Sequence, residues 1–301
     1  MTLILAGILA AAAVASAVEV RMTEDMVGVY EQDQAVLAYR YHNTPKKPYL
    51  MEWYTPGGVN GLRDAPADHL HHHGLMFAIT VEDVNFWEES AGGGMQAHRG
   101  FTEMRVMPAD NRRLAVIGES LGWRAPDSEE LLLLEDRRVS PVRAADTRAR
   151  LLSWQSRLRC PDARDSVTLS GKIYHGLGMR FPAVFDSDGV FRWADDKNGA
   201  FRDGIHYLAR ASWCAVTVET GDQTLTVAMF DHPDNPRPAL WFTMDTPFAY
   251  LSGTLDLSRE PLALAADEAV TIRYGVAAWD VVAEDAAIEA MYRDWLAVET
   301  E

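Results

Sequence analysis

The chain has 301 residues, of which 48% are hydrophobic and nine are tryptophan, so it can bury a large core as one or two domains. Its formal net charge is -16 at pH 7, and no cluster of Lys and Arg rises above this acidic background. Phosphate backbones are bound by positive surfaces, so we expect no nucleic-acid partner.

The first segment predicts export. Residues 3–14 are apolar or small, and Ala15-Ser16-Ala17 matches the small-x-small pattern of a cleavage site. We therefore expect a signal peptide over residues 1–17, cleaved after Ala17, and a periplasmic or secreted mature protein. The apolar run ends by Val18, short of the roughly 20 residues that a transmembrane helix needs. No later segment is apolar enough to span a membrane.

Short apolar and β-branched runs, typical of strands, fill most of the remaining chain and are separated by turns rich in Gly, Pro, Asn and Asp. The run at 166–174 alternates between apolar and polar residues, which suits a strand with one buried face. No linker or repeat divides the chain. We therefore predict an all-β fold, a large two-sheet antiparallel β-sandwich forming a single domain over residues 18–301. The runs are 26–30, 35–41, 75–81, 114–117, 151–158, 167–174, 211–218, 225–230 and 270–279.

One helix is expected near the end of the chain, at 285–298, where Ile288, Met291, Tyr292 and Trp295 fall at helical spacing. It should pack against the sandwich as a terminal brace. Residues 129–134 fit a helix or a strand equally well, and the charged stretch 137–150 reads as a connection.

Cys160 and Cys214 are the only cysteines. Neither belongs to a CxxC pattern, so the sequence leaves open a single disulfide or two buried thiols.

Four of the nine histidines lie in one short segment, Asp68-His69-Leu70-His71-His72-His73. Imidazole is suited both to proton transfer near neutral pH and to metal binding. If the segment is extended, His69, His71 and His73 face one way and His72 the other, because strand side chains alternate. The alternative without a functional role is a solvated loop in which one or two histidines form hydrogen bonds with backbone groups.

The stretch Phe86-Trp87-Glu88-Glu89 follows the histidine segment. An aromatic ring beside carboxylates is the usual lining of a sugar site, since the ring stacks on the sugar and the acids handle hydroxyls or protons. A core tryptophan with two solvated glutamates is the alternative.

Two further loops carry candidate residues. Asp231-His232-Pro233-Asp234-Asn235 follows an apolar run and is fixed by prolines, although Asp231 and Asn235 also suit local turn bonding.

In the stretch 174–181, His175 offers a proton donor and Arg180 a clamp for an anion or a hydroxyl. His206 and Arg63 are weaker candidates. The motifs GxSxG, Walker A, strand-linked GxGxxG and HExxH are missing, which leaves triad hydrolases, P-loop enzymes and dinucleotide-binding enzymes without support.

These motifs in this order make the chain similar to the PmoA-like family over residues 30–296. The matching positions are Pro48-Tyr49, Thr55-Pro56-Gly57-Gly58, the stretch 68–75 and Phe86-Trp87. Arg is common in that family where this chain has His73, so the resemblance favours His69, His71 and His72 as the functional histidines.

The family label refers to a methane oxygenase subunit built from membrane-spanning helices, which this β-rich chain lacks. What the resemblance implies is a β-sandwich, of the galactose-mutarotase-like kind, that is found alongside bacterial carbohydrate breakdown.

We hypothesise a secreted carbohydrate-active enzyme, a glycoside hydrolase or a lyase, acting on a small-molecule or oligosaccharide substrate. The residues expected to be catalytic are His69, His71, His72, Glu88, His175 and His232. The residues expected to bind substrate are Arg63, Asp68, Trp87, His98, Arg180, Asp231 and Asn235.

A second hypothesis is a metalloenzyme, an oxygenase or a metal-assisted eliminase. One divalent ion would be held by His69 and His71, joined by His98 or His206. The third is a non-catalytic periplasmic sugar-binding protein, which would keep the aromatic residues but gives no reason for so many titratable histidines.

Overall fold

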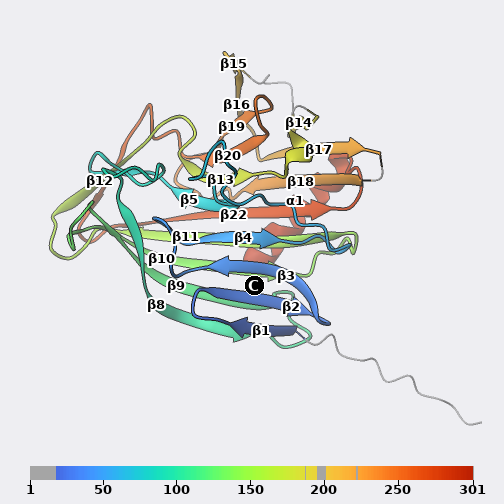
Figure 1. The fold of residues 1–301 in the computed structure, drawn as a ribbon, viewed down its shortest axis with the longest axis horizontal. Coiled ribbons are helices and arrows are strands. Elements are labelled where there is room, and N and C mark those ends of the chain that lie inside the picture. Colours follow the sequence, from blue (N-terminus) through green and yellow to red (C-terminus); the bar gives the residue numbers. More distant parts are fainter. Residues whose placement is uncertain (1–17, 187, 195–200, 222, 301) are drawn as a thin grey trace, which may run out of the picture.

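The computed structural model describes residues 18–186, 188–194, 201–221 and 223–300. The expected signal peptide at residues 1–17 lies outside this part of the chain. Two large sheets and one small sheet account for the strands. Figure 1 shows the long strands of the large sheets running along the longest axis of the molecule.

The first large sheet has ten strands. In spatial order they are β1 (Val18–Met22), β2 (Met26–Glu31), β3 (Gln34–Arg40), β4 (Tyr49–Trp53), β5 (Leu75–Ala78), β13 (Gly176–Arg180), β20 (Tyr250–Thr254), β19 (Leu240–Met244), β16 (His206–Arg210) and β15 (Phe201–Asp203).

The second large sheet has eight strands. In spatial order they are β14 (Val190–Trp193), β17 (Trp213–Thr220), β18 (Gln223–Asp231), β22 (Ala269–Trp279), β11 (Ala149–Arg159), β10 (Leu131–Val142), β9 (Ala115–Arg124) and β8 (Met95–Val106). The small sheet joins β21 (Leu262–Ala265), β12 (Ser166–Ser170), β6 (Thr80–Val81) and β7 (Val84–Asn85).

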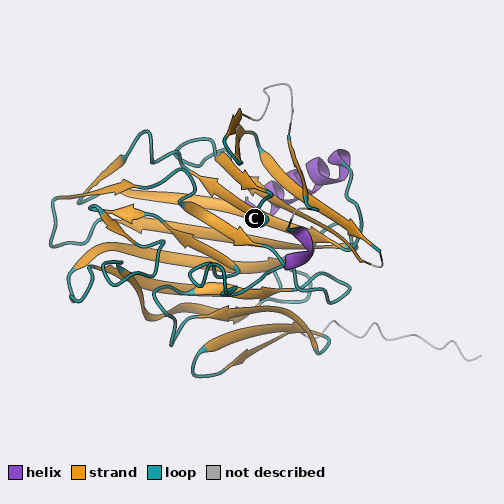
Figure 2. Ribbon diagram, turned by 45° about the horizontal axis from the view of Figure 1, so that its top comes forward, coloured by secondary structure: helices purple, strands orange, loops and turns teal. Residues whose placement is uncertain are grey.

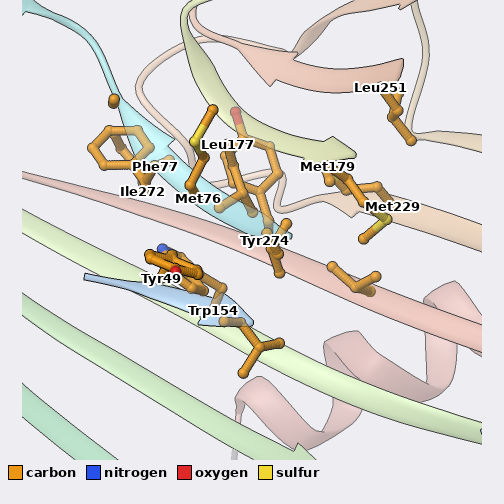
Figure 3. Packing of buried hydrophobic residues seen from close by; sticks show 14 of the residues in the cluster. Tyr49, Met76, Phe77, Trp154, Leu177, Met179, Met229, Leu251, Ile272 and Tyr274 are labelled. Carbon is orange, nitrogen blue, oxygen red and sulfur yellow. The ribbon is translucent and has the colours of Figure 1, made fainter. Parts of the chain in front are cut away.

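The main core lies between the two large sheets. Figure 3 shows Leu177 and Leu251 of the ten-stranded sheet packed toward Trp154 and Tyr274 of the eight-stranded sheet. Burying such side chains supplies most of the driving force for folding, about 25 cal/mol for each Å² of apolar surface. The predicted antiparallel β-sandwich is confirmed.

The predicted C-terminal helix is also confirmed, as α1 (Asp285–Glu299). Its residues Ile288, Met291 and Trp295 are buried in a second apolar cluster with Phe230 and Trp279. Figure 2 shows α1 in purple against one side of the strand layers. The described part of the chain also contains a single-turn helix, η1 (Ala183–Phe185), and no helix long and apolar enough to cross a membrane.

The charged stretch 137–150 was expected to be a connection, and this was wrong for its first residues, which belong to β10. Glu135 and Arg137 point into the core, where the guanidinium donates from Nε to Glu135 Oε1 at 2.8 Å and from Nη2 to Gln96 Oε1 at 3.0 Å. Paired charges thus replace apolar residues on the inner face of this strand. Cys160 and Cys214 are both buried free thiols.

Candidate functional site

A cavity of about 390 Å³ opens on the outer face of the ten-stranded sheet. Leu251 of β20 points into the core, so its neighbour Tyr250, which lines the cavity, points to the opposite face. We call this space the histidine cavity. Its walls are His69, His71, His72, Trp87, Glu88, Tyr174, Ile205, His206, Phe242, Met244, Pro247, Phe248 and Tyr250.

The histidine segment forms two consecutive turns rather than a strand. The backbone N–H of His69 donates to Pro66 O at 2.9 Å, and that of His72 donates to His69 O at 3.0 Å. The predicted alternation is therefore wrong. His69, His71 and His72 share the cavity, with the rings of His69 and His72 stacked 4.7 Å apart, while His73 lines no part of it.

His73 lies in a buried ionic network. Its Nδ1 donates to Asp64 Oδ1 at 2.7 Å and its Nε2 donates to Glu89 Oε1 at 2.9 Å, while the ring of Tyr49 stacks on it. Burial opposes a charge here, but the two carboxylate bonds prevail and raise the pKa of His73 above its ordinary value. The buried Lys47 also bonds Glu89, at 2.7 Å. His73 therefore anchors the segment.

Asp68 joins His69 to Arg180. Its Oδ2 accepts from His69 Nδ1 at 3.1 Å and from Arg180 Nη2 at 2.9 Å. Partial burial opposes ionisation, but the bond from His69 and the charge of Arg180 lower the pKa of Asp68 to about 2. An ionised Asp68 holds the proton of His69 on Nδ1 and leaves Nε2 as the proton acceptor.

Two further histidines of the cavity, His71 and His72, are neutral at physiological pH. Burial, followed by the neighbouring imidazoles, lowers the pKa of His72 to about 2. Burial also lowers the pKa of His71. Neutral imidazoles each offer one donor and one acceptor to a ligand.

Trp87 is almost fully buried, and its ring stacks on His175 at 5.3 Å with 11° between the planes. It therefore closes the wall of the cavity rather than presenting a free face for a sugar. Gly178 of β13 lies beneath it, because a Cβ at this position would come within 2.6 Å of Trp87 and 1.7 Å of the Tyr250 hydroxyl.

The aromatic walls of the cavity come mainly from residues that the sequence did not single out. Tyr174, Phe242, Phe248 and Tyr250 arrive from three separate segments and form no local motif. Only the alternation of Phe242 and Met244 along β19 gave a signal, since it places both on one strand face.

Glu88 is the carboxylate of the cavity wall. Its Oε1 accepts from Lys172 Nζ at 2.6 Å and from the Tyr174 hydroxyl at 3.3 Å, and its Oε2 accepts from Asn85 Nδ2 at 2.6 Å. The bond from Lys172 lowers the pKa of Glu88, so this side chain is a carboxylate at neutral pH and a poor proton donor.

His175, Arg180 and Arg63 lie behind the cavity and not on its wall. Burial lowers the pKa of His175 to about 3 behind Trp87. The guanidinium of Arg180 lies 3.7 Å from the ring centre of Phe248, and Arg63 pairs with Asp186 at 3.3 Å. None of the three lines the cavity, and their predicted roles at a ligand stay predictions.

Asp231, His232 and Asn235 do not reach the cavity either. The Asp231 carboxylate accepts from Asn235 Nδ2 at 2.7 Å and from Ala239 N at 2.8 Å, and burial raises its pKa to about 6. The ring of His232 packs edge-on against Trp295 of α1. The prolines and turn bonds make this a structural loop at the end of β18, in the other sheet.

Three of the four expected metal ligands, His69, His71 and His206, line the histidine cavity, but they are not arranged as a metal site. His206 of β16 lines the cavity, packed 4.7 Å from Phe242, whereas His98 of β8 binds Glu119 at 2.6 Å in the other sheet. Among the residues that the structure describes, no group of three His, Cys, Asp or Glu side chains is arranged to hold a metal ion. Nor does His98 bind at the cavity.

Several buried polar atoms at the cavity have no hydrogen-bond partner within the described chain. They include His72 Nδ1, Trp87 Nε1 and the Tyr250 hydroxyl. Buried polar atoms are normally paired, so their accumulation here suits a ligand that carries many hydroxyl groups.

The fold and the site define an all-β sandwich protein with a histidine- and aromatic-lined cavity on one outer face. The chain belongs to the Family of unknown function (DUF6807), whose sequence profile matches residues 26–293. The expected membership of the PmoA-like family is therefore wrong. No curated protein sequence matches this chain.

Two solved structures share the fold. The GH36 α-galactosidase AgaB from Geobacillus stearothermophilus has a TM-score of 0.53, with 10% identity over 88% of this chain and 41% of that chain. The galactosidase domain of the α-galactosidase-sucrose kinase AgaSK has a TM-score of 0.54, with 10% identity over 88% of this chain and 42% of that one. The chain thus spans about two fifths of the length of these proteins.

Proposed function

We propose that this protein is a carbohydrate-active lyase that binds a sugar in the histidine cavity and uses His69 as its base. The observation that carries the proposal is the contact of Asp68 with His69 Nδ1, in a cavity that also holds the neutral rings of His71 and His72. A volume of about 390 Å³ suits a small ligand.

The likeness to two galactosidases supports the substrate class. Their names assign them action on galactosides, and the sandwich of this chain corresponds to part of each. The unpaired polar atoms and aromatic walls of the histidine cavity suit a sugar, which presents both hydroxyls and apolar ring faces.

Of the two reaction classes expected from the sequence, elimination fits the site better than hydrolysis. Glycoside hydrolases generally place two carboxyl groups on either side of the bond that they cleave, and one of them must donate a proton. Among the described residues of the cavity wall, Glu88 is the single carboxylate, and Lys172 keeps it ionised.

In the proposed reaction, His69 Nε2 removes a proton from a sugar carbon next to a carbonyl or carboxylate. The electron pair forms a carbon–carbon double bond as the adjacent carbon–oxygen bond breaks, and the leaving oxygen takes a proton from Tyr174. Burial raises the pKa of Tyr174, so its hydroxyl is protonated at neutral pH and can donate. Asp68 stabilises the imidazolium that forms on His69.

The test is a screen of oligosaccharides by mass spectrometry. Elimination gives products whose masses sum to that of the substrate, whereas hydrolysis adds one water. We expect elimination products from the wild type and from His42→Ala, a matched change of an exposed histidine outside the cavity. His69→Ala should abolish them.

Three outcomes contradict the proposal. Products that have gained water would favour a hydrolase, and saturable sugar binding without any product would favour the non-catalytic binding protein. Full turnover by His69→Ala would remove His69 from the mechanism.

A further inference from the structure

A second cavity, of about 310 Å³, lies on the outer face of the eight-stranded sheet. Val139 of β10 belongs to the core between the sheets, so Arg138 and Ser140 on either side of it point outward. Both line this second cavity. It therefore opens on the opposite side of the sandwich from the histidine cavity.

Four guanidinium groups surround this space, which we call the arginine cavity. They belong to Arg105 of β8, Arg113 before β9, Arg138 of β10 and Arg273 of β22. The four strands and their connections bring them together from distant parts of the sequence, in a chain whose formal net charge is -16. Such a local reversal of charge attracts anions.

Carboxylates within the protein compensate only part of this charge. Glu103 pairs with both Arg105 and Arg138. Glu299 of α1 pairs with Arg113 at 3.0 Å.

Arg273 has no carboxylate partner within the described residues, and its Nε donates to Gln155 Oε1 at 3.2 Å. Two carboxylates thus face four guanidinium groups.

Ser140 gives a second, independent observation. Its side chain is 2% exposed and lines the arginine cavity, yet its hydroxyl has no hydrogen-bond partner within the described chain. Ser153, its neighbour across the strands, donates to Glu299 at 2.7 Å instead. A buried hydroxyl left unpaired beside guanidinium groups suits an oxygen acceptor from a ligand.

We propose that the arginine cavity is a binding site for a small ligand that carries an oxyanion, a carboxylate or a sulfate group. The planar guanidinium fork matches both groups with two parallel hydrogen bonds, and Ser140 adds a neutral donor. This site lies apart from the histidine cavity, and its occupation does not depend on the reaction proposed there.

Isothermal titration calorimetry of the full chain tests the proposal with four ligands: sulfate, inorganic phosphate, glucuronate and glucose. We expect saturable binding of the anions that is weakened by added sodium chloride, whereas any glucose bound in the histidine cavity should be insensitive to the salt. Equal affinity for sulfate and glucuronate would show that the site recognises the oxyanion alone. Tighter binding of glucuronate would show that it also contacts the sugar ring.

Variants assign the binding to this cavity. Arg138→Gln combined with Arg273→Gln should weaken binding by at least about tenfold, because each change removes a charge-assisted contact. Glu299→Gln should strengthen it, because a competing carboxylate is removed. Arg157→Gln is the matched control, on the same face of β11 but outside the cavity, and should bind as the wild type does.

Thermal unfolding of each variant shows whether it is folded before it is titrated. His69→Ala should bind sulfate and inorganic phosphate unchanged, which separates this site from the proposed lyase site. The inference is overturned if no anion binds saturably, if salt weakens the binding of glucose as much as that of the anions, or if the folded double variant binds the anions as tightly as the wild type.

Discussion

Two histidines that are adjacent in the chain occupy opposite environments. His72 is buried among aromatic rings and other imidazoles, and burial lowers its pKa to about 2. His73 is also buried, yet its bonds to Asp64 and Glu89 raise its pKa. Between these two buried rings, the carboxylate partners rather than burial decide which one is a cation.

The same difference separates function from support. The imidazoles that face the histidine cavity can accept or pass a proton, whereas the bonded cation of His73 holds the segment against the sandwich. Five predictions test the roles of these histidines and of the cavity wall, from the largest expected effect to the smallest.

His69→Ala should lower kcat of the proposed lyase by about a hundredfold or more, because general base catalysis typically contributes that much. The free energy of unfolding should change little, since the His69 side chain is about one third exposed. Steady-state kinetics with denaturant unfolding would measure both. A loss of stability equal to that of His73→Ala would contradict the assignment of a functional role to His69 and a structural role to His73.

His73→Ala should destabilise the fold by about 3 kcal/mol, because removing one partner of a buried ion pair leaves the other charges uncompensated. Here Asp64 and Glu89 would lose their shared cation. Urea unfolding at neutral pH measures the effect, with His42→Ala as the exposed control. An unchanged unfolding midpoint would show that the network does not hold the segment.

Gly178→Ala should cost about 1–3 kcal/mol by overpacking, and it should lower activity by displacing Tyr250 and Trp87 from the cavity wall. Gly61→Ala is the matched control, since a Cβ there meets nothing closer than 3.7 Å. Equal unfolding free energies for the two variants would show that the close approach at Gly178 is not required.

The pH dependence of stability should differ in sign between the two histidines. Folded His72 stays neutral down to about pH 2, while the unfolded chain takes up this proton near 6.5, so His72 lowers stability as the pH falls below 6.5. The folded pKa of His73 is raised, so its contribution is present below 6.5 and is lost as the pH rises through the folded value.

Below pH 6 the free energy of unfolding of His72→Gln should therefore rise relative to that of the wild type, by up to about 1.4 kcal/mol for each pH unit. The loss of unfolding free energy in His73→Gln, relative to the wild type, should instead be largest at acid pH and shrink as the pH rises. Unfolding free energies measured between about pH 5 and pH 8 check both trends. Parallel curves for the two variants would contradict the assigned charges.

Lys172→Met should have the smallest effect. The bond from Lys172 is the main cause of the lowered pKa of Glu88, so its removal should raise this pKa. An NMR titration of the Glu88 side-chain carboxyl measures the shift, and an unchanged pKa would contradict the assigned cause. Lys46→Met, which removes a cation bonded to Gly93 O outside the cavity, should leave the pKa of Glu88 in place.

Much of the fold could be predicted because it depends on local patterns. Alternation at 166–174 and helical spacing over 285–298 gave β12 and α1. The hydrophobic pattern did not predict strands β8 and β10, because polar and charged side chains occupy positions where apolar residues are expected. The buried pair of Glu135 and Arg137 is the clearest case.

The candidate site could be predicted only in part. The density of histidines located the segment at 68–73, and the aromatic neighbour Trp87 located its wall. The loop at 231–238 carried an equally suggestive pattern, but it lies at the end of β18, where its polar groups bond one another and nearby backbone. Local composition does not distinguish a ligand contact from a satisfied turn.

By itself the sequence determined an all-β chain with a terminal helix and a cluster of histidines, since each follows from residues close together in the chain. Only the tertiary structure decided which histidines face the cavity, which of them is charged, and which aromatic and arginine side chains gather around each ligand-sized space. These properties depend on burial and on partners more than ten residues away, such as Arg180 for Asp68 and Glu89 for His73.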